Sequence, residues 1–213
     1  DKELIVKAEA CIALGKIKDK SAVPVLIERL KDKKENWTIQ KRAAEALVNI
    51  RVPEVFQTLV DILRYESEME RKHLDPSPVD SYFSPDEYIE REFAVMLRNF
   101  IETSKEKELY ISSLTEYENN EKLPKTFRYR IGIILGQLNQ KSAIPVLIEC
   151  LKESEKGELR ALAAGLLGKL GDKKTVPYLT KALEDDYLNI GEKVSKEVGE
   201  EMIKGSQMVD GKT

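Results

Sequence analysis

Histidine, which most often moves protons or binds metal ions at neutral pH, is almost absent from this chain. His73 is the only histidine among 213 residues. A histidine-based metal site needs histidine together with further metal ligands. A catalytic triad needs histidine between a serine nucleophile and an acid. We therefore expect no histidine metal centre and no histidine-based catalytic site, and we interpret His73 as an exposed structural residue.

Two other patterns that could do chemistry fail on geometry. The first is the pair of adjacent acids, Asp185 with Asp186 and Glu200 with Glu201. Neighbouring residues on a helix point about 100 degrees apart, so neither pair converges on one substrate as an acid and a base must. The second is the terminal segment 211–213 (GKT), whose spacing from Gly205 is too long for a phosphate-binding loop. We interpret both as surface.

A basic and aromatic segment at 122–130 contains Lys125, Arg128 and Arg130 around Phe127 and Tyr129. Such a mixture can stack and hold the bases of a nucleic acid. However, the whole chain has 35 basic against 38 acidic residues and a net charge of −3. A nucleic-acid binder is usually basic, so we favour a structural role for this segment and argue against a nucleic-acid partner.

The elements that would position any site are repeated. Residues 20–31 (KSAVPVLIERLK) and 141–152 (KSAIPVLIECLK) differ at two places. Further copies of their apolar pattern begin 33 and 153 residues after the first, with a weaker copy at 83. The apolar spacing of three and four residues is helical and occurs twice in each copy, so each unit is a helical hairpin. The units are 3–33, 38–66, 85–118, 125–153 and 158–185.

Two recurring features suggest how each hairpin is built. A hydroxyl residue in the polar break is expected to cap the second helix, and a proline follows in its first turn. A glycine recurs near the end of the first helix, at Gly15, Gly136 and Gly168, with Val48 and Arg98 in the other two units. Glycine within a helix is unfavourable, so its recurrence predicts a close approach of paired helices. The predicted caps are Ser21, Ser142 and Thr175.

Residues 160–172 (RALAAGLLGKLGD), continuing through Val176, Pro177 and Leu179, resemble the HEAT-like repeat found in bilin lyases. Residues 10–30 and 128–151 fit the same pattern. The resemblance implies an all-α fold, a right-handed α-α superhelix of about five hairpins, in a single domain over 1–213. Similar repeats occur in scaffolds, lyase subunits, a hydroxylase and certain DNA glycosylases, so the resemblance does not fix the activity.

The hydroxylase with similar repeats, deoxyhypusine hydroxylase, needs several His-Glu pairs to hold iron. In this chain His73 is followed by Leu74. We therefore predict no metal, no cofactor and no enzymatic activity.

An insertion at 66–84 interrupts the array, and the stretch 66–92 carries nine acidic and three basic residues. Tyr82 and Phe83 within it are either exposed anchors for a partner or a cover for the gap between units, and the residues do not decide between these. After the fifth unit, 186–213 is expected to form a helix that caps the array and a frayed tail.

In HEAT-like arrays the second helices line the concave side, and here those positions are mainly acidic with tyrosines between them. We predict a non-enzymatic scaffold that binds a protein or peptide, of basic character, on this face and the 66–92 insertion. Two alternatives stay open: an enzyme or enzyme subunit similar to the bilin lyases, and a DNA-binding or glycosylase module. The predicted binding residues are Glu28, Arg29, Asp61, Tyr65, Tyr82, Phe83, Glu149, Tyr178 and Lys181.

No apolar run reaches the length of a membrane helix, about 20 residues, so we expect a soluble protein. Cys11 and Cys150 lie in different units, too far apart for a disulfide. Free thiols fit a reducing compartment, and we therefore expect a cytoplasmic location.

Overall fold

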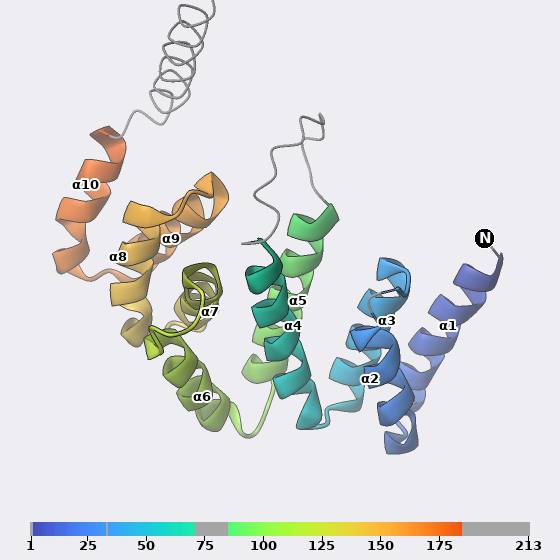
Figure 1. Ribbon diagram of the computed structural model, residues 1–213. Helices are drawn as coiled ribbons and strands as arrows, with labels where there is room; N and C mark the ends of the chain where they lie inside the picture. The colour runs from blue at the N-terminus through green and yellow to red at the C-terminus, as the bar shows by residue number, and fades with distance from the viewer. Residues whose placement is uncertain (1, 33, 71–84, 185–213) are drawn as a thin grey trace, which may run out of the picture. The chain divides into compact units, whose positions relative to one another are not determined.

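The computed structural model describes residues 2–32, 34–70 and 85–184 (Figure 1). The regular elements in these ranges are all helices, which confirms the predicted all-α solenoid of helical hairpins. The chain divides into two compact units, Asp1–Gly171 and Asp172–Thr213. The expected cap at 186–213 and the insertion residues 71–84 lie outside the described ranges, and the single domain over 1–213 stays a prediction.

The first unit holds nine α-helices and two short 3₁₀ turns within its described residues. The first helices of the hairpins are α1 (Lys2–Ile17), α3 (Trp37–Ile50), α5 (Pro85–Glu102), α7 (Lys125–Gln137) and α9 (Gly157–Leu170). The second helices are α2 (Val23–Lys31), α4 (Glu54–Glu70), α6 (Lys107–Asn119) and α8 (Ile144–Glu153), and the 3₁₀ turns are η1 (Lys20–Ala22) and η2 (Lys141–Ala143). The second unit contains η3 (Lys173–Thr175) and α10 (Val176–Glu184).

Stacking within the first unit runs through the first helices, which contact one another in the order α1, α3, α5, α7, α9 (Figure 1). Each second helix packs against the first helix of the following hairpin, for example α2 on α3 and α8 on α9. The repeated leucines form the core between them: Leu26, Leu47 and Leu147 are at most 1% exposed. Because a hairpin cannot cover its own apolar face, this burial holds the array together.

The predicted hydroxyl caps of the second helices are wrong. A 3₁₀ turn precedes α2, and the carboxylate of Asp19 accepts a hydrogen bond from the amide of Ser21 at 2.8 Å. Asp172 does the same for Lys174 at 2.9 Å before α10, while Gln140 at this place makes no side-chain cap. The capping aspartates Asp19 and Asp172 therefore lie two and three residues before the predicted caps Ser21 and Thr175. The prolines of α2 and α8 lie in the first turn, as predicted.

Two of the recurring glycines permit close helix packing, as predicted, and the third does not require it. A Cβ atom at Gly15 would lie 2.8 Å from the Cα atom of Ala46 on α3. At Gly136 it would lie 3.2 Å from a side-chain carbon of Leu166 on α9, whereas at Gly168 nothing lies within 4 Å. The same register therefore has different steric demands in different units.

Within the described residues, no helix is long and apolar enough to cross a membrane. Cys11 and Cys150 are both free and buried, as predicted.

Glu118 near the end of α6 is a buried carboxyl group without a hydrogen-bond partner for either side-chain oxygen. It is 2% exposed, and its Oε1 would lie 3.2 Å from a Cβ atom placed on Gly132 of α7. Burial raises the pKa of Glu118 from 4.5 to about 7, and the positive charge of Arg128 partly opposes this rise. The protein therefore accommodates this side chain best in its protonated form.

We expect the stability of the protein to fall as the pH rises from 4.5 to 7. In this window the unfolded chain has released the proton of Glu118 and the folded protein still holds it, so folding becomes less favourable by about 3 kcal/mol. Glu118→Gln should remove this part of the slope in urea unfolding followed across the window. Glu116→Gln, at an exposed position on the same helix, should keep it, and equal slopes in the two variants would contradict the assignment.

The glycine register supplies a matched pair of substitutions. Gly15→Ala should destabilise the protein by about 1 to 3 kcal/mol, because the new methyl group meets the backbone of Ala46. Gly168→Ala should instead stabilise it by about 0.5 to 1 kcal/mol, since the position is open and alanine favours a helix. Chemical unfolding of both variants measures the difference. If both substitutions changed the free energy of unfolding in the same direction, the position in the repeat, and not the contact with Ala46, would set the effect.

Candidate functional site

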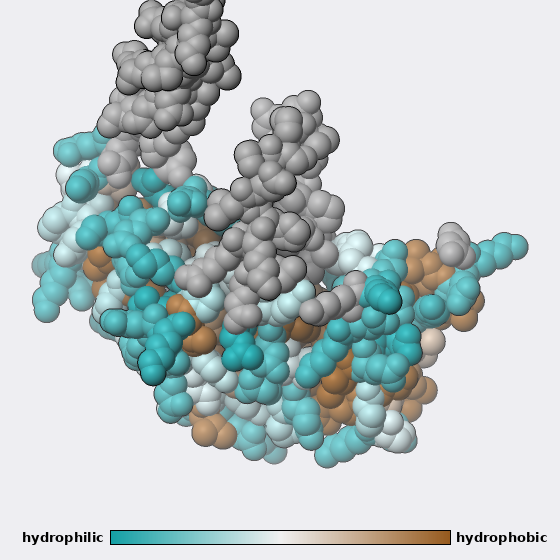
Figure 2. Space-filling view, viewed as in Figure 1, coloured by the Kyte–Doolittle hydropathy of each residue, from teal (hydrophilic) through white to brown (hydrophobic). Residues whose placement is uncertain are grey.

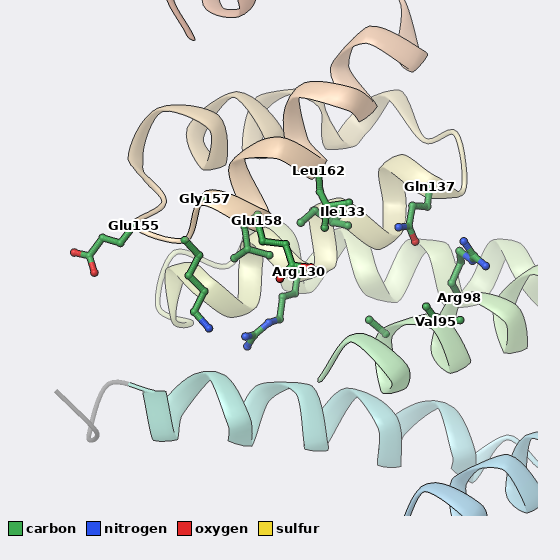
Figure 3. A pocket seen from close by; sticks show the side chains of 12 residues that line it. Val95, Arg98, Arg130, Ile133, Gln137, Glu155, Gly157, Glu158 and Leu162 are labelled. Atoms are coloured by element: carbon green, nitrogen blue, oxygen red, sulfur yellow. The ribbon is translucent and has the colours of Figure 1, made fainter. Parts of the chain in front are cut away.

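A cleft of about 570 Å³ opens between α5, α7 and the start of α9 (Figure 3). This volume suits a small-molecule or cofactor-sized ligand. It lies among the first helices of the hairpins, whereas the sequence analysis placed binding on the second helices. Its lining residues are Ala94, Val95 and Arg98 of α5, Arg130, Ile133 and Gln137 of α7, and Glu155, Lys156, Gly157, Glu158, Leu159 and Leu162 from the loop before α9 and from α9 itself.

Apolar side chains from all three helices form the middle of the cleft. Val95 and Leu162 are 36% and 38% exposed, and Ile133 between them is buried. Exposed aliphatic groups on a concave surface favour the binding of an apolar group. The cleft can therefore cover an aliphatic or aromatic part of a ligand.

Arg98 supplies a positive charge at one end of this apolar surface. It lies at the opposite end of the cleft from Glu155 (Figure 3). The Arg98 side chain donates from Nε and Nη2 to the Oδ1 atom of Asn99, at 3.3 and 2.9 Å. This acceptor is a neutral amide, so these two hydrogen bonds orient the guanidinium group without neutralising its charge. Arg98 is thus suited to bind an anionic group.

Arg130 is a fixed part of the wall. It is 6% exposed and points toward α4 (Figure 3), where its Nη1 donates to the hydroxyl of Ser67. The same hydroxyl donates to the carbonyl of Leu63 at 2.8 Å. A guanidinium group is expensive to bury without such partners. The contact therefore ties α7 to α4 below the cleft.

The loop before α9 is held in place by hydrogen bonds. The hydroxyl of Ser154 accepts from the amide of Lys156 at 3.3 Å, and the thiol of Cys150 donates to the carbonyl of Leu159 at 3.6 Å. Burial, with the nearby charge of Glu149, raises the pKa of Cys150 to about 12. A thiol that stays protonated at neutral pH is a poor nucleophile. Cys150 therefore has a structural role beside the cleft.

Arg98 lies at the register where other first helices of the array carry glycine. It occupies the register of Gly15 and Gly136, where an added Cβ atom would lie 2.8 Å from Ala46 and 3.2 Å from Leu166 of the next first helix. Arginine cannot allow so close an approach. The replacement of glycine by a long charged residue at this register was the sequence signal for the cleft. The sequence analysis noted it and drew no site from it.

The predicted binding residues of the first hairpins pair with their neighbours. Glu28 and Arg29 form an ion pair at 2.8 Å, and Arg29 also lies 3.4 Å from Glu35. Asp61 accepts a hydrogen bond from Gln57 at 2.9 Å, and Tyr65 is half-buried one turn further along α4. A role of these residues in binding stays a prediction.

The remaining predicted residues are distributed differently. Glu149 is part of an internal network, because it accepts from Arg128 at 3.1 Å and from the hydroxyl of Tyr129 at 3.4 Å. Tyr178 and Lys181 lie on α10 in the second unit. Tyr82 and Phe83 lie outside the described residues. Among the described residues of the first unit, the structure brings Glu28 and Arg29 together, and the predicted set as a binding site stays a prediction.

The residues present do not fit an iron centre held by His-Glu pairs. The sequence contains one histidine. Within the described ranges, three or more histidine, cysteine, aspartate or glutamate side chains do not gather where they could hold a metal ion. Iron and zinc sites in proteins need several such ligands at one point.

This chain is similar to known enzymes, among them deoxyhypusine hydroxylases. It is 27% identical over 186 residues to deoxyhypusine hydroxylase of Gallus gallus, over 86% of this chain and 60% of that protein. It is 24% identical to deoxyhypusine hydroxylase of Neurospora crassa, over 89% of this chain and 74% of the relative. A solved structure of human deoxyhypusine hydroxylase with glycerol matches 95% of this chain at 22% identity and a TM-score of 0.32.

These relatives overturn two predictions. The chain was expected to be a non-enzymatic scaffold, and the expectation of no enzymatic activity followed from its single histidine. Both were wrong, because sequence similarity over most of the chain leads to a hydroxylase.

The predicted repeat family is confirmed: the model described as HEAT repeats matches residues 1–74 and 120–190. The chain belongs to the HEAT repeat family.

Proposed function

We propose that this chain is the substrate-binding subunit of an enzyme and that its substrate lies in the cleft between α5, α7 and α9. The observation that carries the proposal is the 27% identity to a hydroxylase over 86% of the chain, which spans about 60% of the length of that chicken relative. The cleft supports it, because its volume and apolar lining are those of a ligand site.

The activity assigned to the chain is binding and orientation. The single histidine and the side chains within the described ranges do not fit an iron centre, so the proposal assigns no chemical step to a metal. Val95, Ile133 and Leu162 would cover an apolar part of the substrate. Arg98 would orient an anionic group at one end, through the part of its guanidinium that Asn99 does not occupy.

The charges around the cleft favour an anionic over a cationic substrate. Three lining residues are basic (Arg98, Arg130 and Lys156) and two are acidic (Glu155 and Glu158). Glu155 points outward at the far end of the cleft from Arg98 (Figure 3). An aliphatic or aromatic carboxylate or phosphate ester therefore matches both the apolar lining and the excess of positive charge.

A pair of eight-carbon probes tests this assignment. Octanoate should raise the melting temperature of the chain in a concentration-dependent way, whereas octylamine, of similar size and opposite charge, should not. Arg98→Gln should weaken octanoate binding roughly tenfold, since one charge-assisted hydrogen bond is lost. Isothermal titration calorimetry measures the affinities.

The control is Arg64→Gln, because Arg64 is a half-exposed arginine on α4 that does not line the cleft. It should bind octanoate as the wild type does. Unchanged melting temperatures without ligand would show that both variants fold. Equal binding of octanoate and octylamine, or full octanoate binding by Arg98→Gln, would contradict an anionic substrate at this site.

The hydroxylase relatives supply a second test. With iron(II) and oxygen, the purified chain should not add an oxygen atom to a peptide that carries deoxyhypusine, because the sequence has a single histidine and the described residues hold no cluster of metal ligands. Mass spectrometry of the peptide measures the product. Hydroxylation by the chain alone would show that it is a complete hydroxylase and that the proposed division of labour is wrong.

A further inference from the structure

Lys169 on α9 continues the wall of the cleft beyond Leu162. It lies seven residues after Leu162, and seven residues return a helix to nearly the same face. Gly165 lies between them on this face and carries no side chain. The Nζ atom of Lys169 reaches α7, where it donates to the backbone carbonyl of Gln137 at 3.4 Å. Gln137 lines the cleft, so Lys169 brings a positive charge to its edge.

Arg98 lies at the same end of the cleft as Gln137. Figure 3 shows both side chains at this end, whereas the acidic lining residues Glu155 and Glu158 lie toward the opposite end. The first helices stack in the order α5, α7, α9. Arg98 and Lys169 therefore approach Gln137 from the helices on either side of it.

The two basic residues at this end keep their charge for a ligand. The amide oxygen of Asn99 holds Arg98 at 2.9 Å, and the carbonyl of Gln137 holds Lys169. Both acceptors are neutral, so they orient the cations without neutralising them. The side-chain amide of Gln137 has no hydrogen-bond partner within the described ranges, and its NH₂ group can donate to an anionic oxygen.

We propose that the substrate of the cleft is a phosphate monoester, whose phosphate group lies between Arg98 and Lys169 and accepts a hydrogen bond from Gln137. The proposal rests on the function proposed above, which allows either a carboxylate or a phosphate ester. A phosphate monoester carries a charge of about −1.5 to −2 at pH 7 and three acceptor oxygens, so it can use two cations and an amide at once. A carboxylate has one charge, which the planar guanidinium of Arg98 can satisfy alone.

A phosphate ester can be a soluble molecule or a membrane lipid, and the surface favours the soluble one. On the face shown in Figure 2, hydrophilic residues cover most of the surface over α7 to α9. A protein that lies on a membrane usually presents an apolar or strongly basic face instead. The net charge of −3 also opposes binding to an anionic membrane. We therefore expect a soluble ester.

Octyl phosphate and octanoate together test the proposal on the full chain. In isothermal titration calorimetry, octyl phosphate should bind roughly tenfold more tightly than octanoate, because it adds a charge-assisted contact. Lys169→Gln should remove this advantage and leave the affinity for octanoate nearly unchanged. Lys16→Gln is the matched control, since Lys16 occupies the same register in the first hairpin, and it should change neither affinity. Inorganic phosphate should bind more weakly than octyl phosphate, because it has no apolar group to cover.

A second variant makes the test independent of Lys169. Gln137→Glu should abolish octyl phosphate binding, because a carboxylate between the two cations would pair with them and repel the phosphate. Octyl phosphate binding no tighter than octanoate, or an equal loss of both in Lys169→Gln, would overturn the phosphate assignment and leave the proposed function in place. Absence of binding by both ligands would overturn the proposed function as well. Co-sedimentation of the chain with phosphatidate vesicles would overturn a soluble ester.

Discussion

The constraint on which this protein depends is that each hairpin must cover the apolar stripe of the next first helix. Ile39 and Ala43 are almost fully buried because α1 and α2 lie against them, and Ile131 and Ile134 are buried at the equivalent positions of α7. Burial of such side chains stabilises by about 1.5 to 3 kcal/mol each. The same kind of interface recurs between successive hairpins. A substitution at one junction therefore affects the packing at that junction and leaves the arrangement of the other hairpins in place.

The cleft is a place where this packing is relaxed. At the first hairpin, an added Cβ atom at glycine would lie 2.8 Å from the backbone of Ala46, and at the fourth it would lie 3.2 Å from a side-chain carbon of Leu166. At the third hairpin Arg98 occupies that register, and its side chain lines the cleft. Local rules of packing are broken mainly where a protein needs a site. The arginine thus brings a positive charge to the cleft at this register.

Sequence analysis found the helices and the buried registers because apolar periodicity reports burial directly. It missed the aspartate caps, since hydroxyl and carboxylate residues stand close together in the polar break and either can accept the free amides. It also proposed Glu149 as a binding residue, which stays a prediction, without anticipating its ion pair. The partner of Glu149, Arg128, is 21 residues away and on another helix, so the sequence spacing gave no indication of their ion pair.

The error about function has a related physical origin. In a repeat protein most of the sequence encodes packing, so similarity to the hydroxylases over 86% of the chain reports a shared helical body. Metal ligands would be a few polar residues among the many packing residues of these helices. A single histidine cannot supply a site held by several histidines. The absence of histidine ligands for a metal excludes one way of carrying out one step of a reaction. The sequence analysis used this absence to exclude enzymatic activity as a whole. The proposed role, in which the chain binds and orients a substrate, needs a cleft and a charge, and Arg98 lines a cleft of this kind.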